Sequence, residues 1–136
     1  KDLLKDIVTI RLEDKTLISD EAIKLAVEAS GGNLRQLIKL IHFAAEEALT
    51  FDEERITKKE IESSIEELER ELSSKVMGLQ TFLNQIKNDK MVDDTENNIQ
   101  NLAKATKMEL VFAYFNGTIW YGLNPAIEKS LKLYTK

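Results

Sequence analysis

The sequence predicts a mostly α-helical fold with one β-hairpin, divided into a helical domain over residues 1–76 and a smaller domain over residues 77–136. Apolar residues recur every three or four positions through most of the chain, which is the spacing of one face of an α-helix. Residues 108–123 instead carry two runs of β-branched and aromatic residues around Asn116-Gly117. That pattern is the strongest short-range signal for a hairpin, and it places the only predicted strands near the end of the chain.

The composition is that of a globular protein. Of the 136 residues, 43% are hydrophobic and 32% are charged, and no run approaches the roughly 20 apolar residues that a membrane span needs. The chain has no cysteine, which excludes disulfide, zinc-finger and thiol chemistry and is compatible with the cytoplasmic location that we expect. Because it begins on Lys1 within a helical pattern, we expect a fragment of a longer protein.

Charge is distributed unevenly along the chain. Residues 1–75 hold 12 Lys and Arg against 18 Asp and Glu, a net charge of −6, whereas residues 76–136 hold 7 against 6, a net charge of +1. Nucleic-acid binding needs clustered Lys and Arg. The acidic first half therefore argues against a general nucleic-acid surface there.

Four helices are predicted in the first domain. The first covers residues 2–13, and the second begins after Ser19, a good N-cap that two acidic residues follow. Gly31 ends the second helix, because a left-handed residue is common at that position and glycine adopts it without strain.

The third and fourth helices also have recognisable starts. The third should run from the N-cap Asn33 to about Leu49. The fourth opens with a capping box, in which the Thr57 hydroxyl and the Glu60 carboxylate satisfy backbone donors reciprocally, and its pattern continues to Val76. The apolar stripe expected to bury the third helix consists of Leu34, Leu37, Ile38, Ile41, Ala45, Ala48 and Leu49.

The second domain is predicted to contain two short helices, the hairpin and a closing helix. Apolar residues at helical spacing mark a helix over residues 79–86, and a second helix covers residues 95–107. The closing helix has Asn124 as its cap and Pro125 at its first position, where a missing N–H costs nothing. This order is close to a winged-helix arrangement, with Asn116-Gly117 as the tip of the wing.

A two-residue type I′ turn would pair Phe115 with Thr118. That register gives the hairpin one face that should pack on the preceding helices and a second face for a partner or the neighbouring domain to cover. The packed face would consist of Leu110, Phe112, Tyr114, Ile119, Tyr121 and Leu123. The second face would consist of Val111, Ala113, Phe115 and Trp120.

A single arginine stands where the helix dipole opposes it. The sequence SGGNLR, residues 30–35, stops one helix, restarts the next and places Arg35 in its first turn. The positive end of the dipole lies there and disfavours a cation. One interpretation is a helix stop, a cap and a solvated arginine. The other is that Arg35 binds an anion, because a guanidinium and a helix N-terminus together make a phosphate site.

The stretch LISDEAIKLAVEASGGNLRQLIKLIHFAAEEAL, followed by ITKKEIESSI, resembles the helical lid of AAA+ ATPases, the small domain that follows their nucleotide-binding core. In that family the third lid helix opens with a G-x-x-R pattern called sensor 2, here Gly32-Asn33-Leu34-Arg35. The resemblance implies that Arg35 reaches the γ-phosphate of ATP bound in the core domain, and that Gly31 and Gly32 shape the turn that aims it.

The lid resemblance covers roughly residues 1–76. The stretch FNGTIWYGLNPAIEKSL resembles the wing and final helix of the winged-helix domain that follows the lid in many members of the family. Those members include replication initiators, origin-recognition proteins and related archaeal and bacterial ATPases.

The sequence contains no G-x-x-x-x-G-K-[ST] phosphate loop and no apolar strand ending in paired acids that could hold Mg²⁺. We therefore expect no ATP hydrolysis by this chain alone and no tight nucleotide binding. The resemblance implies ATP and Mg²⁺ in a full-length parent, with the missing core domain as the main partner and other subunits of an oligomer as further partners.

No metal site is expected within the chain. His42 is the only histidine, and a lone histidine lacks the companions that a metal site needs, so we assign it no role. The acidic cluster of the fourth helix is interpreted as a solvated helix face. It consists of Glu66, Glu67, Glu69 and Glu71.

The helix over residues 95–107 is the candidate recognition helix of the winged element. Three acidic residues at its start, Asp93, Asp94 and Glu96, would repel a DNA backbone. DNA and a protein therefore both stay open as partners, and no membrane is expected. The candidate contact residues on this helix and the hairpin are Asn98, Asn101, Lys104, Lys107 and Trp120.

Two other functions compete with the ATPase interpretation. One is a non-enzymatic DNA-binding regulator, in which Arg35 is a surface residue. The other is a helical protein-interaction module with no link to nucleotide.

Overall fold

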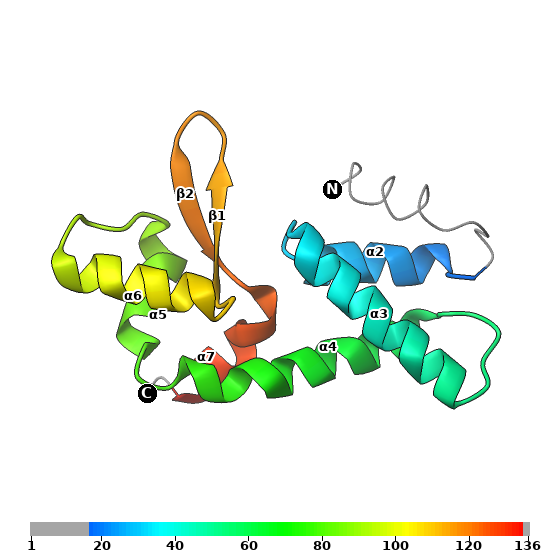
Figure 1. The fold of residues 1–136 in the computed structure, drawn as a ribbon. Helices are drawn as coiled ribbons and strands as arrows, with labels where there is room; N and C mark the ends of the chain where they lie inside the picture. Colours follow the sequence, from blue (N-terminus) through cyan, green and yellow to red (C-terminus); the bar gives the residue numbers. More distant parts are fainter. Residues whose placement is uncertain (1–16, 135–136) are drawn as a thin grey trace. The chain divides into compact units, whose positions relative to one another are not determined.

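The structure is a computed structural model that describes residues 17–134, and the helix predicted over residues 2–13 lies outside that range. The described chain is mostly helical, with one two-stranded antiparallel sheet (Figure 1). It divides into two compact units, of which unit 1 ends at Leu68 and unit 2 begins at Glu69. The division falls within α4 (Lys58–Ser73). The domain boundary expected between residues 76 and 77 stays a prediction.

Unit 1 contains α2 (Asp20–Ala29), α3 (Leu34–Thr50) and the first part of α4. Both predicted N-caps of α2 and α3 are confirmed. The Ser19 hydroxyl accepts the N–H of Ala22 at 3.2 Å, and the Asn33 side chain accepts the N–H of Gln36 at 2.9 Å.

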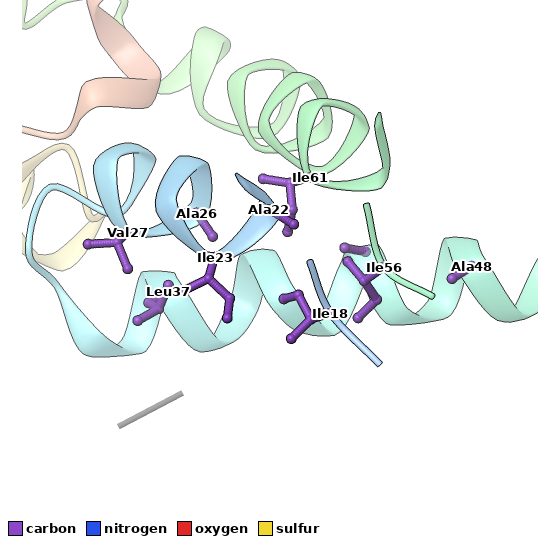
Figure 2. Close-up of a cluster of buried hydrophobic side chains, with 10 residues drawn as sticks. Ile18, Ala22, Ile23, Ala26, Val27, Leu37, Ala48, Ile56 and Ile61 are labelled. Atoms are coloured by element: carbon purple, nitrogen blue, oxygen red, sulfur yellow. The ribbon is translucent and has the colours of Figure 1, made fainter. Parts of the chain in front are cut away.

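A parallel bridge between Ile18 and Ile56 joins the segments that lead into α2 and α4. The Ser19 N–H donates to the Ile56 carbonyl at 3.0 Å, and the Ile56 N–H donates to the Leu17 carbonyl at 2.7 Å. Both isoleucines belong to the buried cluster of unit 1 (Figure 2). The cluster comprises Ile18, Ala22, Ile23, Ala26, Val27, Leu37, Ala44, Ala48, Ile56 and Ile61.

The buried stripe of α3 differs from the predicted one. Leu34, Ile38 and Leu49 were expected inside, but Ile38 is 49% exposed and Leu49 is 80% exposed. Apolar residues occupy more than one side of this helix, so periodicity alone does not select the buried side. Packing against α2 selects the side with small alanines, which allow close approach. The buried residues of α3 are Gln36, Leu37, Leu40, Ala44 and Ala48.

One of the two bonds of the predicted capping box is present at the start of α4, the one that the Glu60 carboxylate accepts. The Glu60 carboxylate accepts the N–H of Thr57 at 2.7 Å. The Thr57 hydroxyl donates to the same carboxylate, a contact that the prediction did not include. The helix ends at Ser73, and the 3₁₀ turn η1 (Ser74–Val76) completes the pattern expected to reach Val76.

Unit 2 holds two helices, the hairpin and a closing helical segment, as predicted. Within it, α5 contacts β2 and α7, and α6 contacts β1. Its elements beyond η1 are α5 (Gln80–Asp89), α6 (Glu96–Lys107), β1 (Val111–Phe115), β2 (Ile119–Leu123), η2 (Pro125–Ile127) and α7 (Glu128–Tyr134).

Asn124 joins the hairpin to the closing segment and is completely buried. Its side chain accepts the N–H of Ala126 at 3.0 Å, which confirms the predicted cap, and donates to the Glu109 carbonyl at 2.8 Å. The closing helix was predicted as one piece, but it is split into η2 and α7.

The hairpin register is one residue away from the prediction. Phe115 pairs with Ile119, not with Thr118, so residues 116–118 form a three-residue loop. A type I′ turn needs a positive φ at both central residues, and Gly117 has one (98°) whereas Asn116 does not. The expected two-residue turn is therefore wrong.

The shift exchanges residues between the two faces. Directly paired residues share a face, so Trp120 lies with Tyr114, and Ile119 lies with Phe115. The expectation that Ile119 packs on the helices is wrong, because this side chain is 55% exposed. Trp120, expected on the face of Ala113 and Phe115, lies on the other one.

Candidate functional site

The turn between α2 and α3 is held by hydrogen bonds from two side chains. Gly31 and Gly32 have φ values of 62° and 82°, so the predicted left-handed stop is confirmed and extends over two residues. Ser30 is buried; its hydroxyl donates to the Val27 carbonyl at 2.6 Å and accepts the Gly32 N–H at 3.2 Å. The end of α2 and the two glycines are therefore held together by one side chain.

Gln36 ties the two helices to each other. Its side-chain amide donates to the Ala29 carbonyl at the end of α2 at 3.0 Å, while its N–H donates to the Asn33 cap. The side chain is buried. Sequence reasoning did not single out Gln36 or Ser30; the available signal was a pair of polar residues flanking a double glycine. Together they set the direction in which α3 leaves the turn.

Arg35 lies on the exposed side of this turn. It is exposed to solvent, and no hydrogen bond or ion pair of its side chain is found within residues 17–134. The first turn of α3 contains no acidic residue. A cation at this end of a helix is opposed by the dipole and here has no carboxylate to offset it. The arrangement suits an anion that approaches from outside, because the guanidinium and the helix N-terminus attract the same charge.

The lysine and the histidine further along α3 both contact neighbouring side chains of the same helix. Lys39 Nζ lies 5.8 Å from the centre of the Phe43 ring, a cation–π distance. His42 is exposed and lies 3.1 Å from the Glu46 carboxylate. Within the described part of the chain, no group of three or more His, Cys, Asp or Glu side chains could hold a metal ion.

A shallow hollow of about 330 Å³ lies between α2 and the start of α4. Its lining carries charges of both signs and does not include Arg35. The lining residues are Glu21, Lys24, Leu25, Glu28 and Lys58.

On α6, the predicted contact residues do not share one face. Asn98 and Lys107 are nine residues apart, about 2.5 turns, so they point in opposite directions. Asn98 and Asn101 are half-buried, whereas Lys104 and Lys107 are exposed in the last two turns. The exposed stripe instead joins Gln100 to the two lysines.

Acidic residues lie at the N-terminal end of the same helix. Asp93, Asp94 and Glu96 are all exposed. The Thr95 hydroxyl caps the helix by accepting the N–H of Asn98 at 3.2 Å. The first turn of α6 is therefore negatively charged, and the positive charge of the helix comes from two lysines in its last turns.

Trp120 packs within the hairpin. Its ring stacks on Tyr114 with centroids 4.4 Å apart, and Lys90 Nζ lies 5.6 Å from its centre. The backbone reinforces this contact, because the Tyr121 N–H donates to the Lys90 carbonyl at 2.9 Å. Burial raises the pKa of the Tyr114 hydroxyl. Trp120 is therefore half-buried and contacts both an aromatic ring and a cation, and its role as a contact residue stays a prediction.

Comparison with known proteins does not add to this geometry. The chain matches no protein-family model and no curated protein. Among residues 17–134, no helix is long and apolar enough to cross a membrane.

Proposed function

We propose that the chain is the lid and the winged-helix domain of an AAA+ type ATPase, in which Arg35 binds the γ-phosphate of ATP held by a separate core domain. One observation supports this proposal above the others. Arg35 is exposed and unpaired among the described residues, and it stands three residues after the second of two left-handed glycines, in a turn that Ser30 and Gln36 hold by hydrogen bonds. Buried, hydrogen-bonded side chains next to an unpaired surface cation are expected when the cation must be held in one direction toward a ligand.

The residues present fit only part of a nucleotide site. Arg35 and the N-terminus of α3 are suited to hold a terminal phosphate. Bound ATP and Mg²⁺ would supply the phosphoryl group and its charge neutralisation, and their remaining ligands would come from the core domain. Arg35 would position the γ-phosphate, and the lid would move when that phosphate is lost.

For the second domain, we propose contact with a protein and not with DNA. The order of α5, α6, the hairpin and α7 supports the winged-helix interpretation. The hairpin contributes no counter-charge for phosphates, because residues 110–127 contain no charged side chain. On α6, two exposed lysines are accompanied by an acidic first turn.

The nucleotide part is tested by ATP turnover of the full-length protein. Arg35→Ala should lower kcat by about 10²-fold or more, as removal of a donor to a developing charge does in other enzymes. Arg55→Ala is the matched control, because Arg55 is also an exposed arginine of unit 1, and it should leave turnover unchanged. Equal turnover in wild type and Arg35→Ala would favour the helical interaction module.

The partner is tested by fluorescence anisotropy with duplex and single-stranded DNA at two salt concentrations. We expect no tight binding at low salt. Tight, salt-sensitive binding that is lost in Lys104→Glu/Lys107→Glu would show that the protein-contact proposal is wrong and that α6 reads DNA.

A further inference from the structure

The outer edge of β1 has free backbone groups. In the β1–β2 ladder, the backbone N–H and C=O groups of the even-numbered residues point toward β2. Two bonds at the ends of β1 establish this: the Asn124 N–H donates to the Leu110 carbonyl at 2.9 Å, and the Asn116 N–H donates to the Thr118 carbonyl at 3.3 Å. The N–H and C=O groups of Ala113 and Phe115 therefore point away from β2. Both residues are exposed, and among residues 17–134 no other strand pairs with β1 (Figure 1).

The opposite edge of the hairpin is occupied. On β2 the Tyr121 N–H donates to the Lys90 carbonyl, which follows α5. Natural edge strands are usually protected by a charge, a proline or a bulge. On β1 the strand sequence VFAYF contains no charge and no proline, and its pairing with β2 is regular. The sheet therefore has one unprotected edge, at Ala113 and Phe115.

We infer that this edge pairs with the same edge of a second copy of the chain. Antiparallel pairing about Tyr114 places Ala113 opposite Phe115 of the second copy, and both residues have their free N–H and C=O groups on that side. The arrangement is self-complementary in size, because the large Phe115 side chain, 76% exposed, meets a small alanine on the same face. It also brings the two Tyr114 side chains to neighbouring positions on the other face.

Charge favours a second copy over other occupants. The chain carries a net charge of −5, but residues 110–127 carry no charge at all. The hairpin residues of two copies can therefore meet at this edge without opposing like charges. A nucleic-acid backbone or a charged peptide would find no counter-charge among those residues. This inference does not depend on the role proposed for Arg35.

Sedimentation equilibrium of the chain over a wide concentration range tests the inference. The average mass should rise from 15.5 kDa toward twice that value. Ala113→Pro removes an outward N–H and none of the N–H groups that bond to β2, so it should keep the β1–β2 ladder and weaken the dimer by about tenfold or more. Leu133→Lys is the control, because it adds a charge to an exposed apolar side chain of α7 and should leave the dimer unchanged.

Amide hydrogen exchange gives a second readout at the edge itself. Exchange at Ala113 and Phe115 should slow as concentration rises, while exchange in the exposed loop at Thr118 should not change. If Ala113→Pro disturbs Trp120 fluorescence, Ala113→Lys replaces it, because an edge lysine blocks pairing and keeps the N–H. A chain that is monomeric at every concentration, or a dimer that both edge variants leave intact, would overturn the inference.

Discussion

At the scale of single residues, Glu60 is a buried carboxylate that stays charged. Burial alone raises the pKa of this carboxyl, but hydrogen bonds from the Thr57 hydroxyl and N–H, together with the charge of Lys59, lower it by more. The pKa therefore lies below its ordinary value of 4.5. A carboxyl whose pKa is lower in the folded state than in the unfolded state stabilises the fold at every pH above the unfolded-state pKa. This contribution is lost as the pH falls through the folded-state pKa.

Glu60→Gln should consequently reduce the free energy of unfolding by about 1 kcal/mol at pH 7. The difference from wild type should shrink below pH 4.5, where the carboxyl is protonated in the unfolded chain. Urea denaturation followed by circular dichroism at pH 7, 5 and 3.5 measures it, with the exposed Glu62→Gln as control. A difference that does not depend on pH would contradict this account of the capping box.

Gly122 leaves room for the aromatic pair of the hairpin. A Cβ at this position would lie 3.1 Å from a Tyr114 ring carbon and 3.5 Å from a Trp120 ring carbon. Gly122→Ala should therefore displace the Tyr114 ring and destabilise unit 2 by about 1 kcal/mol or more. Trp120 is the chain's single tryptophan, so its fluorescence should change. Thr118→Ala, in the exposed loop, should change neither quantity, and an unaltered spectrum in Gly122→Ala would show that the stack tolerates a methyl group.

At the scale of elements, α3 gives a direct comparison between neighbouring positions. Leu37 is fully buried in the cluster of unit 1, whereas Ile38 is half-exposed. Leu37→Ala should lower the free energy of unfolding by about 2–5 kcal/mol, and Ile38→Ala by less than about 1 kcal/mol. Urea denaturation followed by circular dichroism measures both. Equal losses of unfolding free energy in the two variants would mean that the apolar stripe predicted from the sequence, which includes both residues, is the buried one.

The elements that could be predicted are those whose signals are local. Ser19, Asn33, Thr95 and Asn124 each cap a helix through a bond to an N–H two or three residues away. The hairpin register was not predictable in this way. It depends on the loop conformation as well as on residue type, and Asn116 does not take the positive φ that a type I′ turn requires.

At the scale of the whole molecule, the sequence identified the residues of the candidate site, but not the side chains that hold its turn in place. The G-x-x-R pattern identified Arg35 and its turn, because glycine and arginine have distinctive local chemistry. Ser30 and Gln36 act through the carbonyls of Val27 and Ala29, contacts that exist only once α2 and α3 are folded against each other. On α6, half of the predicted contact residues are half-buried, since only tertiary packing decides which side of a helix faces solvent.

The most direct test of the central proposal compares ATP and ADP affinity in the full-length protein, for wild type and Arg35→Ala. If Arg35 binds the γ-phosphate, the variant should bind ATP about ten- to a hundredfold more weakly, the equivalent of one charge-assisted hydrogen bond, and bind ADP as wild type does. Isothermal titration calorimetry gives both constants, with Arg55→Ala as control. Equal losses for ATP and ADP, or no loss for either, would contradict a role for Arg35 in recognising the terminal phosphate.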